Sequence, residues 1–329
     1  MPPSYGTKAY WDARFQHEDK YEWLLPADSL NAVIREALSE PQKKSRSPGD
    51  SSRAPQILHI GCGSSDLSFQ LRDLVAAPNQ ITNVDYSSMA VQKCRQRESE
   101  ALFATTADAA SFATLNGSDS MSMRWETADL LAAKSIARLG ENYPSRSAVS
   151  HDVGGCDDDP LFFDVVADKS TSDSISCAAD APVLLPFVSP RMVQQEHPQQ
   201  QQTDNDAAAN TTKAATAFVH PMYLLAVHMA VLTRPRTGRW CVLSYSDERF
   251  SFLDGGGKKG IGAAKAEEPV EEDLLQRGFP DPRRFWRVER RERVTVAPPA
   301  AATGSGGHVV HQPEIAYWLY VLVRTNEVP

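Results

Sequence analysis

The stretch that decides the fold is QILHIGCGSSDLS, Gln56 to Ser68, in which an apolar segment runs into a glycine turn and then into polar residues able to begin a helix. A strand, a glycine-rich turn and a helix N-terminus together present backbone N–H groups and the positive end of a helix dipole, which suits a nucleotide or another anionic group. The dinucleotide fingerprint has a third glycine where this chain has Asp66. The motif therefore predicts a nucleotide-like ligand and disfavours NAD.

Strand and helix patterns alternate along the rest of the chain. Strands are predicted at Ile57 to Ile60, Ile81 to Val84, Met123 to Trp125, Phe162 to Ala167 and Trp240 to Ser244, and helices after Trp23 and at Leu67 to Val75, Ser88 to Arg97 and Phe218 to Thr233. Two long apolar or alternating segments, FWRVERRERVTV and EIAYWLYVLVR, predict a C-terminal antiparallel strand pair. The expected fold is α/β: a doubly wound, mostly parallel, seven-stranded Rossmann-like sheet.

Low-complexity segments interrupt this pattern, and they lower the expected number of domains. They are rich in alanine, serine, glutamine and glycine, and they fall at about 40–54, 99–120, 132–159, 176–215, 254–270 and 297–312. Such segments bury too little apolar area to offset the entropy of ordering them, so we expect surface loops there. The prediction is one domain over residues 1–329, with an N-terminal segment, 1–24, in front of the core.

Composition argues against several classes of partner. With 42 acidic and 34 basic residues, the chain has no excess of positive charge, so no nucleic-acid partner is expected. The N-terminus lacks a basic and then apolar leader, and no run of about 18 apolar residues occurs, so neither secretion nor a membrane span is expected. Five scattered cysteines without C-x-x-C spacing predict reduced thiols, in the cytoplasm or nucleus, and no metal site is expected.

An acidic residue follows the second predicted strand, in the sequence ITNVDYSS. Asp85 lies about 20 residues beyond the glycine turn, where its carboxylate can accept hydrogen bonds from both ribose hydroxyls of an adenosine. Tyr86 can place its ring on a purine face. The alternative is that Asp85 caps the helix that begins near Ser87. The two roles are compatible.

The third and fourth predicted strands also end in polar residues. MRWETADLL brings Asp129 and Leu130 to the edge of the sheet, where a carboxylate and a backbone N–H can meet the edge of an adenine. FFDVVADKSTSDS brings Asp168 and Lys169 to the same edge. Because the carboxyl ends of parallel strands meet at one edge of a sheet, four strand ends are predicted to converge on one crevice.

These residues carry a family resemblance. The chain resembles class I S-adenosylmethionine-dependent methyltransferases, and within them the methyltransferase-like family that methylates lysines of translation elongation factor 1-alpha, of the type encoded with endothelin-converting enzyme 2. The matching stretches are YWDARF, YEWL, ILHIGCGSSDLS, ITNVDYSS, MRWETADLL, FFDVVADKSTSDS and RTGRWCVLSYSDERF. They cover the patterned core in the expected order.

The resemblance implies S-adenosyl-L-methionine as the cofactor and a set of residues that bind it. The glycine turn would lie against its methionine part, the ends of the second and third strands would hold the adenosine, and the N-terminal segment would fold back as a lid. The implied cofactor-binding residues are Trp11, Phe15, Trp23, Gly61, Cys62, Gly63, Asp85, Tyr86, Asp129, Leu130 and Lys169.

The implied reaction is in-line transfer of a methyl group, with a protein lysine, as in translation elongation factor 1-alpha, as the acceptor. A small-molecule acceptor and a non-catalytic binding or scaffold protein are the alternatives, because the family has DKGTLDA where this chain has DKSTSDS, and asparagine where it has Ser64. No catalytic residue is assigned. Asp168 and Asp173 would either help to remove the proton of an acceptor lysine or cap the local backbone.

Overall fold

The computed structural model describes residues 3–44, 54–105, 122–141, 162–192, 215–254, 270–296 and 315–329. Within them, a seven-stranded sheet has the order β3-β2-β1-β4-β7-β9-β8. Its strands are β1 (Ile57–Ile60), β2 (Ile81–Asp85), β3 (Arg124–Thr127), β4 (Val165–Lys169), β7 (Arg239–Ser244), β8 (Trp286–Val296) and β9 (Ile315–Arg324). Neighbours from β3 to β7 are parallel and the pairs with β9 are antiparallel. The predicted fold class is confirmed.

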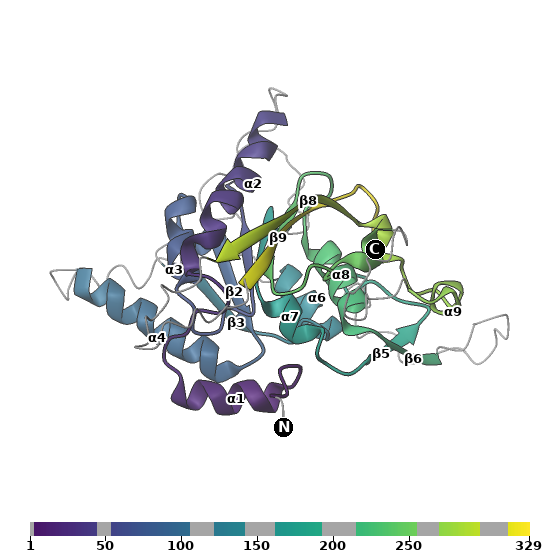
Figure 1. The fold of residues 1–329 in the computed structure, drawn as a ribbon, viewed down its shortest axis with the longest axis horizontal. Helices are drawn as coiled ribbons and strands as arrows, with labels where there is room; N and C mark the ends of the chain where they lie inside the picture. Colours follow the sequence, from purple (N-terminus) through teal and green to yellow (C-terminus); the bar gives the residue numbers. More distant parts are fainter. Residues whose placement is uncertain are drawn as a thin grey trace, which may run out of the picture.

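Helices cover both faces of the sheet (Figure 1). On one face lie η1 (Ala27–Leu30), α2 (Asn31–Lys44), α3 (Leu67–Leu71) and α4 (Ser88–Thr105), and on the other α6 (Ala133–Glu141), α7 (Thr171–Ile175) and α8 (Pro221–Leu232). Successive strand residues point into the two cores in turn. Ile57, for example, packs in the core beneath α2 and α3, and Leu58 in the core beneath α6 and α8. Burial on both faces explains the continuous apolar runs of these strands.

Shorter elements complete the chain. They are α1 (Lys8–His17), η2 (Arg72–Leu74), η3 (Pro78–Gln80), η4 (Ser251–Leu253), α9 (Glu272–Gln276), η5 (Pro282–Arg284), and the strands β5 (Ala181–Leu185) and β6 (Ala215–Val219), which pair as a separate two-stranded sheet. The first of them, α1, packs against α4 at the lower edge of the molecule in Figure 1.

The predicted helix Phe218 to Thr233 is wrong at its start. Phe218 and Val219 belong to β6, and α8 begins only at Pro221. Proline at the first helical position needs no N–H partner, and the proline ring pushes the preceding residue out of the helical region. All twelve residues of α8 are buried, so its apolar side chains surround the axis and give no amphipathic pattern from which a boundary could be located.

Four of the expected loops contain regular structure where they are described. Helix α2 extends to Lys44, α4 extends to Thr105 and α6 occupies 133–141, while β5 lies within 176–215 and β6 begins at Ala215. In α6, Ile136 and Leu139 are buried against α8, so two apolar positions three residues apart were enough to fix a short helix. The low-complexity composition of these segments as a whole concealed the short helices and strands within them. The remaining parts of the predicted insertions lie almost entirely outside the described residues.

The register of the parallel strands aligns their carboxyl ends. Ile60 lies opposite Val84 on one side and Asp168 on the other, and Asp85 lies opposite Thr127. The residues that follow these strands therefore gather at one edge of the sheet, and this edge carries the site described below.

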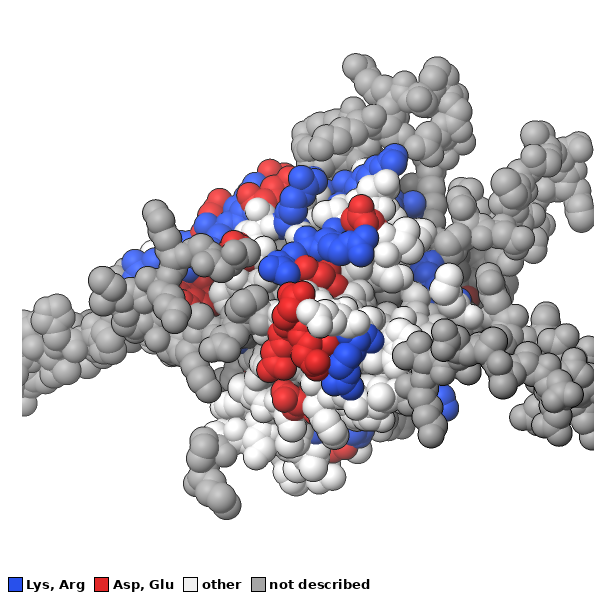
Figure 2. Space-filling model, turned by 90° about the vertical axis from the view of Figure 1, so that its right-hand side faces the viewer, with Lys and Arg blue, Asp and Glu red and all other residues white. Residues whose placement is uncertain are grey.

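The surface has mixed charge where it is described. On the face shown in Figure 2, groups of basic and acidic side chains lie next to one another. Among the described helices, none is both long and apolar enough to cross a membrane.

Candidate active site

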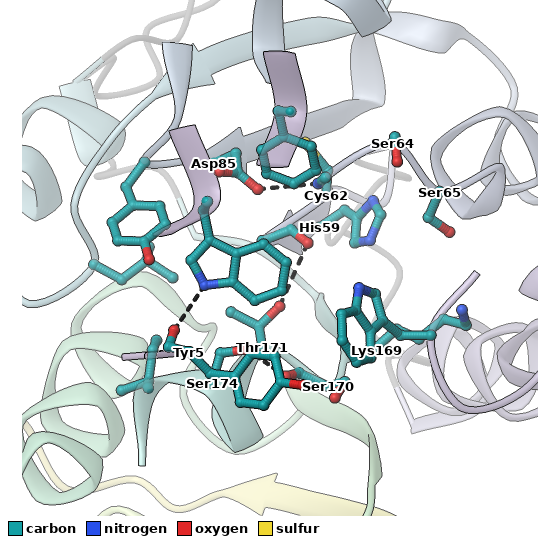
Figure 3. A pocket seen from close by; sticks show the side chains of 18 of the residues that line it. Tyr5, His59, Cys62, Ser64, Ser65, Asp85, Lys169, Ser170, Thr171 and Ser174 are labelled. Carbon is teal, nitrogen blue, oxygen red and sulfur yellow. Dashed lines mark hydrogen bonds between the residues drawn. The ribbon is translucent and has the colours of Figure 1, made fainter. Parts of the chain in front are cut away.

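A cavity opens at the carboxyl edge of β1, β2, β3 and β4 (Figure 3). Together with the open space at its mouth it encloses about 960 Å³ that no protein atom fills. All eleven residues that the sequence predicted to bind a cofactor line this cavity. The structure thus brings the predicted set together, and its role in binding stays a prediction.

The glycine turn after β1 forms the floor. Gly61 and Gly63 have φ angles of +56° and +47°, in the left-handed region that glycine adopts without strain. A side chain on Gly61 would also meet Thr171 Oγ1 at 2.1 Å, while one on Gly63 would lie 3.3 Å from the ring of Phe15. Cys62, between them, is buried, and burial raises the pKa of its thiol, so the thiol stays protonated at pH 7.

Asp85 connects the floor to the start of α4. One carboxylate oxygen accepts a hydrogen bond from Gly63 N at 3.0 Å, and the other accepts one from Ser87 N at 2.8 Å. Burial raises the pKa of Asp85 to about 6 in spite of these two bonds. The capping role is thus present in the structure, and each oxygen keeps a second lone pair that a ribose hydroxyl can use.

The end of β3 forms a second wall. Asp129 is exposed and accepts a hydrogen bond from Leu131 N at 2.9 Å. The neighbouring Leu130 is buried, and its carbonyl accepts a hydrogen bond from His228 Nδ1 at 2.8 Å. Burial lowers the pKa of His228 to about 4, so this histidine is neutral at pH 7 and anchors the strand end to α8.

The N-terminal segment forms an aromatic roof, Tyr5 to Trp23, over the cavity. The ring centroids of Trp11 lie 5.7 Å from those of both Phe15 and Trp23, and Trp11 Nε1 donates to Tyr5 O at 2.7 Å. Gly6 permits the backbone to approach the turn after α7, because a side chain there would meet the backbone of Ala178 at 2.4 Å. The roof therefore touches the core on both sides of the cavity.

Lys169, the last residue of β4, pairs with this roof. Its ammonium donates to Glu22 Oε2 at 2.6 Å, and the Lys169 side chain is 3% exposed. Burial lowers the pKa of Lys169, and the nearby Glu22 carboxylate opposes this shift. Within the motif YEWL, only the tryptophan was predicted to bind the cofactor. The position of a carboxylate between two aromatic residues was the signal that was missed.

Other residues that line the cavity were also missed. His59 lies inside the otherwise apolar β1, with Nδ1 2.9 Å from Ser68 Oγ, and burial lowers its pKa to about 4. A polar residue in a buried strand was the available signal. The remaining missed lining residues are Tyr5, Gly6, Glu18, Tyr21, Ser64, Ser65, Ala128, Leu131, Ser170, Thr171, Ser174, Ile175 and Ala178.

Asp168 and Asp173 do not line the cavity. Asp168 Oδ1 accepts hydrogen bonds from the backbone N–H groups of Thr171 and Ser172, and burial raises its pKa to about 7. Asp173 is paired with Arg249 at 3.0 Å. Asp168 therefore caps the segment after β4, as the capping alternative predicted, whereas Asp173 binds Arg249 and the backbone N–H of Tyr245 after β7.

Comparison with known proteins supports part of the sequence interpretation. Residues 51–145 match a family model described as a methyltransferase domain. The chain is 30% identical over 182 residues to the methyltransferase srdJ of Neurospora crassa. This alignment covers 55% of this chain and 58% of that protein. It is 28% identical over 174 residues to EEF1A lysine methyltransferase 4 of Mus musculus, which covers 52% of this chain and 46% of that protein.

The chain spans about half the length of these curated relatives. A solved structure, the magnesium protoporphyrin IX methyltransferase of Synechocystis, aligns over 98% of this chain and 96% of that chain, with a TM-score of 0.33 and 11% identity. A likeness of that size carries no argument. The family match supports a methyltransferase domain from β1 to α6, with S-adenosylmethionine as the cofactor.

Proposed function

We propose that the chain is an S-adenosylmethionine-dependent methyltransferase that acts on a lysine of a protein similar to translation elongation factor 1-alpha. The observation that carries the proposal is the single cavity lined by all eleven residues expected from the sequence. The mouse relative, whose name is EEF1A lysine methyltransferase 4, supports the acceptor class. We place the reaction in the cytoplasm or nucleus, because the cysteines are scattered and odd in number.

The residues of the cavity fit the cofactor. Asp85 keeps lone pairs free for ribose hydroxyls, and the exposed Asp129 can accept a hydrogen bond from the amino group of adenine. Gly61 and Gly63 line the cavity, so the backbone of the glycine turn can approach the methionine part closely. Lys169 has three ammonium donors and gives one to Glu22, which leaves two for a carboxylate.

When bound, the cofactor supplies a methyl group already activated by its positively charged sulfur. The chain's own residues then have to orient the acceptor, exclude water and leave the acceptor amine unprotonated. The aromatic roof excludes water from one side. Ser170, just before α7, and Ser174, within α7, form a polar wall of the cavity that would contact the acceptor.

The proposal is tested by incubating the purified chain with methyl-labelled S-adenosylmethionine and two acceptor pools, recombinant elongation factor 1-alpha and a protein-free extract of small metabolites. Label on a lysine of the protein, located by mass spectrometry, supports it. Label only in the small-molecule pool would favour the alternative acceptor class. Failure to bind the cofactor in calorimetry would favour a scaffold.

A further inference from the structure

The carboxylate of Glu22 connects three separate parts of the molecule. It accepts hydrogen bonds from Lys169 Nζ at 2.6 Å, from Ser65 Oγ at 2.8 Å and from Asp66 N at 2.6 Å. Lys169 ends β4, and Ser65 and Asp66 follow the glycine turn after β1. Because β1 and β4 are neighbours in the sheet, one side chain of the roof joins the ends of two central strands. Figure 3 shows Lys169 and Ser65 on the same side of the cavity.

The pair formed by Glu22 and Lys169 is largely removed from water. The Lys169 side chain is 3% exposed and the Glu22 side chain 24%. Among the described residues, Glu22 is the one carboxylate that pairs with Lys169. A buried ammonium that loses its partner is strongly disfavoured, so the ion pair with Lys169 holds the Glu22 carboxylate, and with it the roof segment, in place. Glu22 itself does not line the cavity.

The roof around Glu22 packs as one unit. Tyr21 and Trp23 flank Glu22 in sequence, and both line the cavity. The guanidinium carbon of Arg14 lies 4.7 Å from the ring centroid of each. Trp23 in turn contacts Trp11 at 5.7 Å between centroids. A displacement of Glu22 would therefore move the aromatic side chains that cover the cavity.

We propose that Glu22 is a positioning residue that holds the aromatic roof closed over the cavity and thereby sets the rate at which the cofactor leaves. It acts through Lys169, which faces the cavity, and through the residues after the glycine turn. The part of the proposal that concerns cofactor exchange rests on the proposed function. The closed position of the roof is a property of the ligand-free protein and does not depend on the proposed function.

The first experiment measures backbone hydrogen exchange in the ligand-free full chain. Glu22→Gln keeps the shape of the side chain and removes its charge. Asp19→Asn is the matched control, because Asp19 lies in the same segment and pairs with Lys93 at 2.7 Å, but is 91% exposed. We expect exchange within residues 5–23 to accelerate roughly tenfold or more in Glu22→Gln and to change little in Asp19→Asn. Equal exchange in the two variants would overturn the proposal.

A second variant distinguishes a role of Glu22 in holding the roof closed from a general contribution to the stability of the fold. In the double variant Glu22→Gln/Lys169→Met no unpaired buried ammonium remains, so the melting temperature should recover. Hydrogen exchange in residues 5–23 should stay fast, because the ion pair that holds the roof is still absent. If exchange in this segment slows to the wild-type rate, Glu22 stabilises the fold and does not hold the roof.

The third measurement is the dissociation rate of S-adenosylmethionine by stopped flow. Glu22→Gln should release it roughly tenfold faster than wild type, whereas Asp19→Asn should match wild type. An unchanged dissociation rate in Glu22→Gln would refute the control of cofactor release by Glu22. If no variant binds the cofactor while the difference in hydrogen exchange persists, the proposed function fails, but the role of Glu22 in holding the roof closed is retained.

Discussion

Asp85→Asn should weaken cofactor binding while leaving the stability of the fold at pH 7 equal or higher. Burial raises the pKa of Asp85 from 3.8 to about 6. The folded state then binds this proton more tightly than the unfolded state, so the free energy of unfolding falls as the pH rises from about 4 to 6. Two pKa units correspond to about 3 kcal/mol at pH 7.

The substitution removes this penalty and introduces another. The amide oxygen of asparagine can accept from only one of the two N–H donors, those of Gly63 and Ser87, that the carboxylate satisfies. An unsatisfied buried donor costs about 1–3 kcal/mol. We therefore expect the variant to be as stable as wild type at pH 7 or up to about 2 kcal/mol more stable, with the difference shrinking toward pH 5, as measured by urea unfolding.

Binding of S-adenosylmethionine should weaken instead. A hydrogen bond to a charged acceptor contributes about 1.5–3 kcal/mol, so loss of the charged acceptor should raise Kd roughly a hundredfold in calorimetry. For wild type, a pKa of about 6 leaves roughly one-eleventh of Asp85 ionised at pH 5, so Kd should rise about tenfold between pH 7 and pH 5.

The pH profile identifies the residue responsible. The dependence should disappear in Asp85→Asn and persist in Asp129→Asn, because Asp129 is exposed. A wild-type Kd that is constant from pH 5 to 7, or normal affinity in Asp85→Asn, would refute the assignment of Asp85 to the ribose.

Three further substitutions test the glycine turn, the segment after β4 and the attachment of β3 to α4. Gly61→Ala should lower stability by about 2 kcal/mol or more and impair cofactor binding, since φ is +56° and the new methyl would meet Thr171; unaltered melting would contradict this. Ser170 has φ +71°, so Ser170→Gly should be about 1 kcal/mol more stable than Ser170→Ala in urea unfolding. Glu98→Ala should cost about 2–4 kcal/mol in the same assay, because two buried donors, one of them Trp125 Nε1, lose their acceptor, whereas Glu98→Gln should cost less.

The parallel core could be predicted from sequence because its signals are local. Each strand from β1 to β4 is a short apolar run that ends in a polar or glycine residue, and right-handed connections leave few ways to arrange such units. The site followed from this, since residues after parallel strands must meet. Asp85 and Lys169, 84 positions apart in the chain, could be placed together without any knowledge of their contacts.

The rest depended on partners that are distant in sequence. Glu22 becomes important through Ser65, Asp66 and Lys169, which lie 43 to 147 residues later, and no periodicity marks such partners. The short helix α6 has two buried apolar residues, and its stability comes from α8, which the low-complexity segments separate from it. Tertiary packing supplied what local propensity did not.

The segment after β4 differs from the resembled family at Ser170 and Ser172, and in the proposed function it would face the acceptor. Ser170 occupies a left-handed position where that family has glycine, which costs stability, and Ser172 is buried with its backbone N–H donating to Asp168 Oδ1. The bonds that shape the floor do not involve either hydroxyl, because Thr171 Oγ1 donates to Ile60 O at 2.8 Å and its N–H donates to Asp168. The two serines thus leave the cofactor side unchanged, and Ser170 changes the polarity of the wall that an acceptor would meet. A Ser170→Gly/Ser172→Leu variant should therefore keep cofactor affinity in calorimetry while its turnover of the acceptor changes; a loss of cofactor affinity would show that the two sides are not separable.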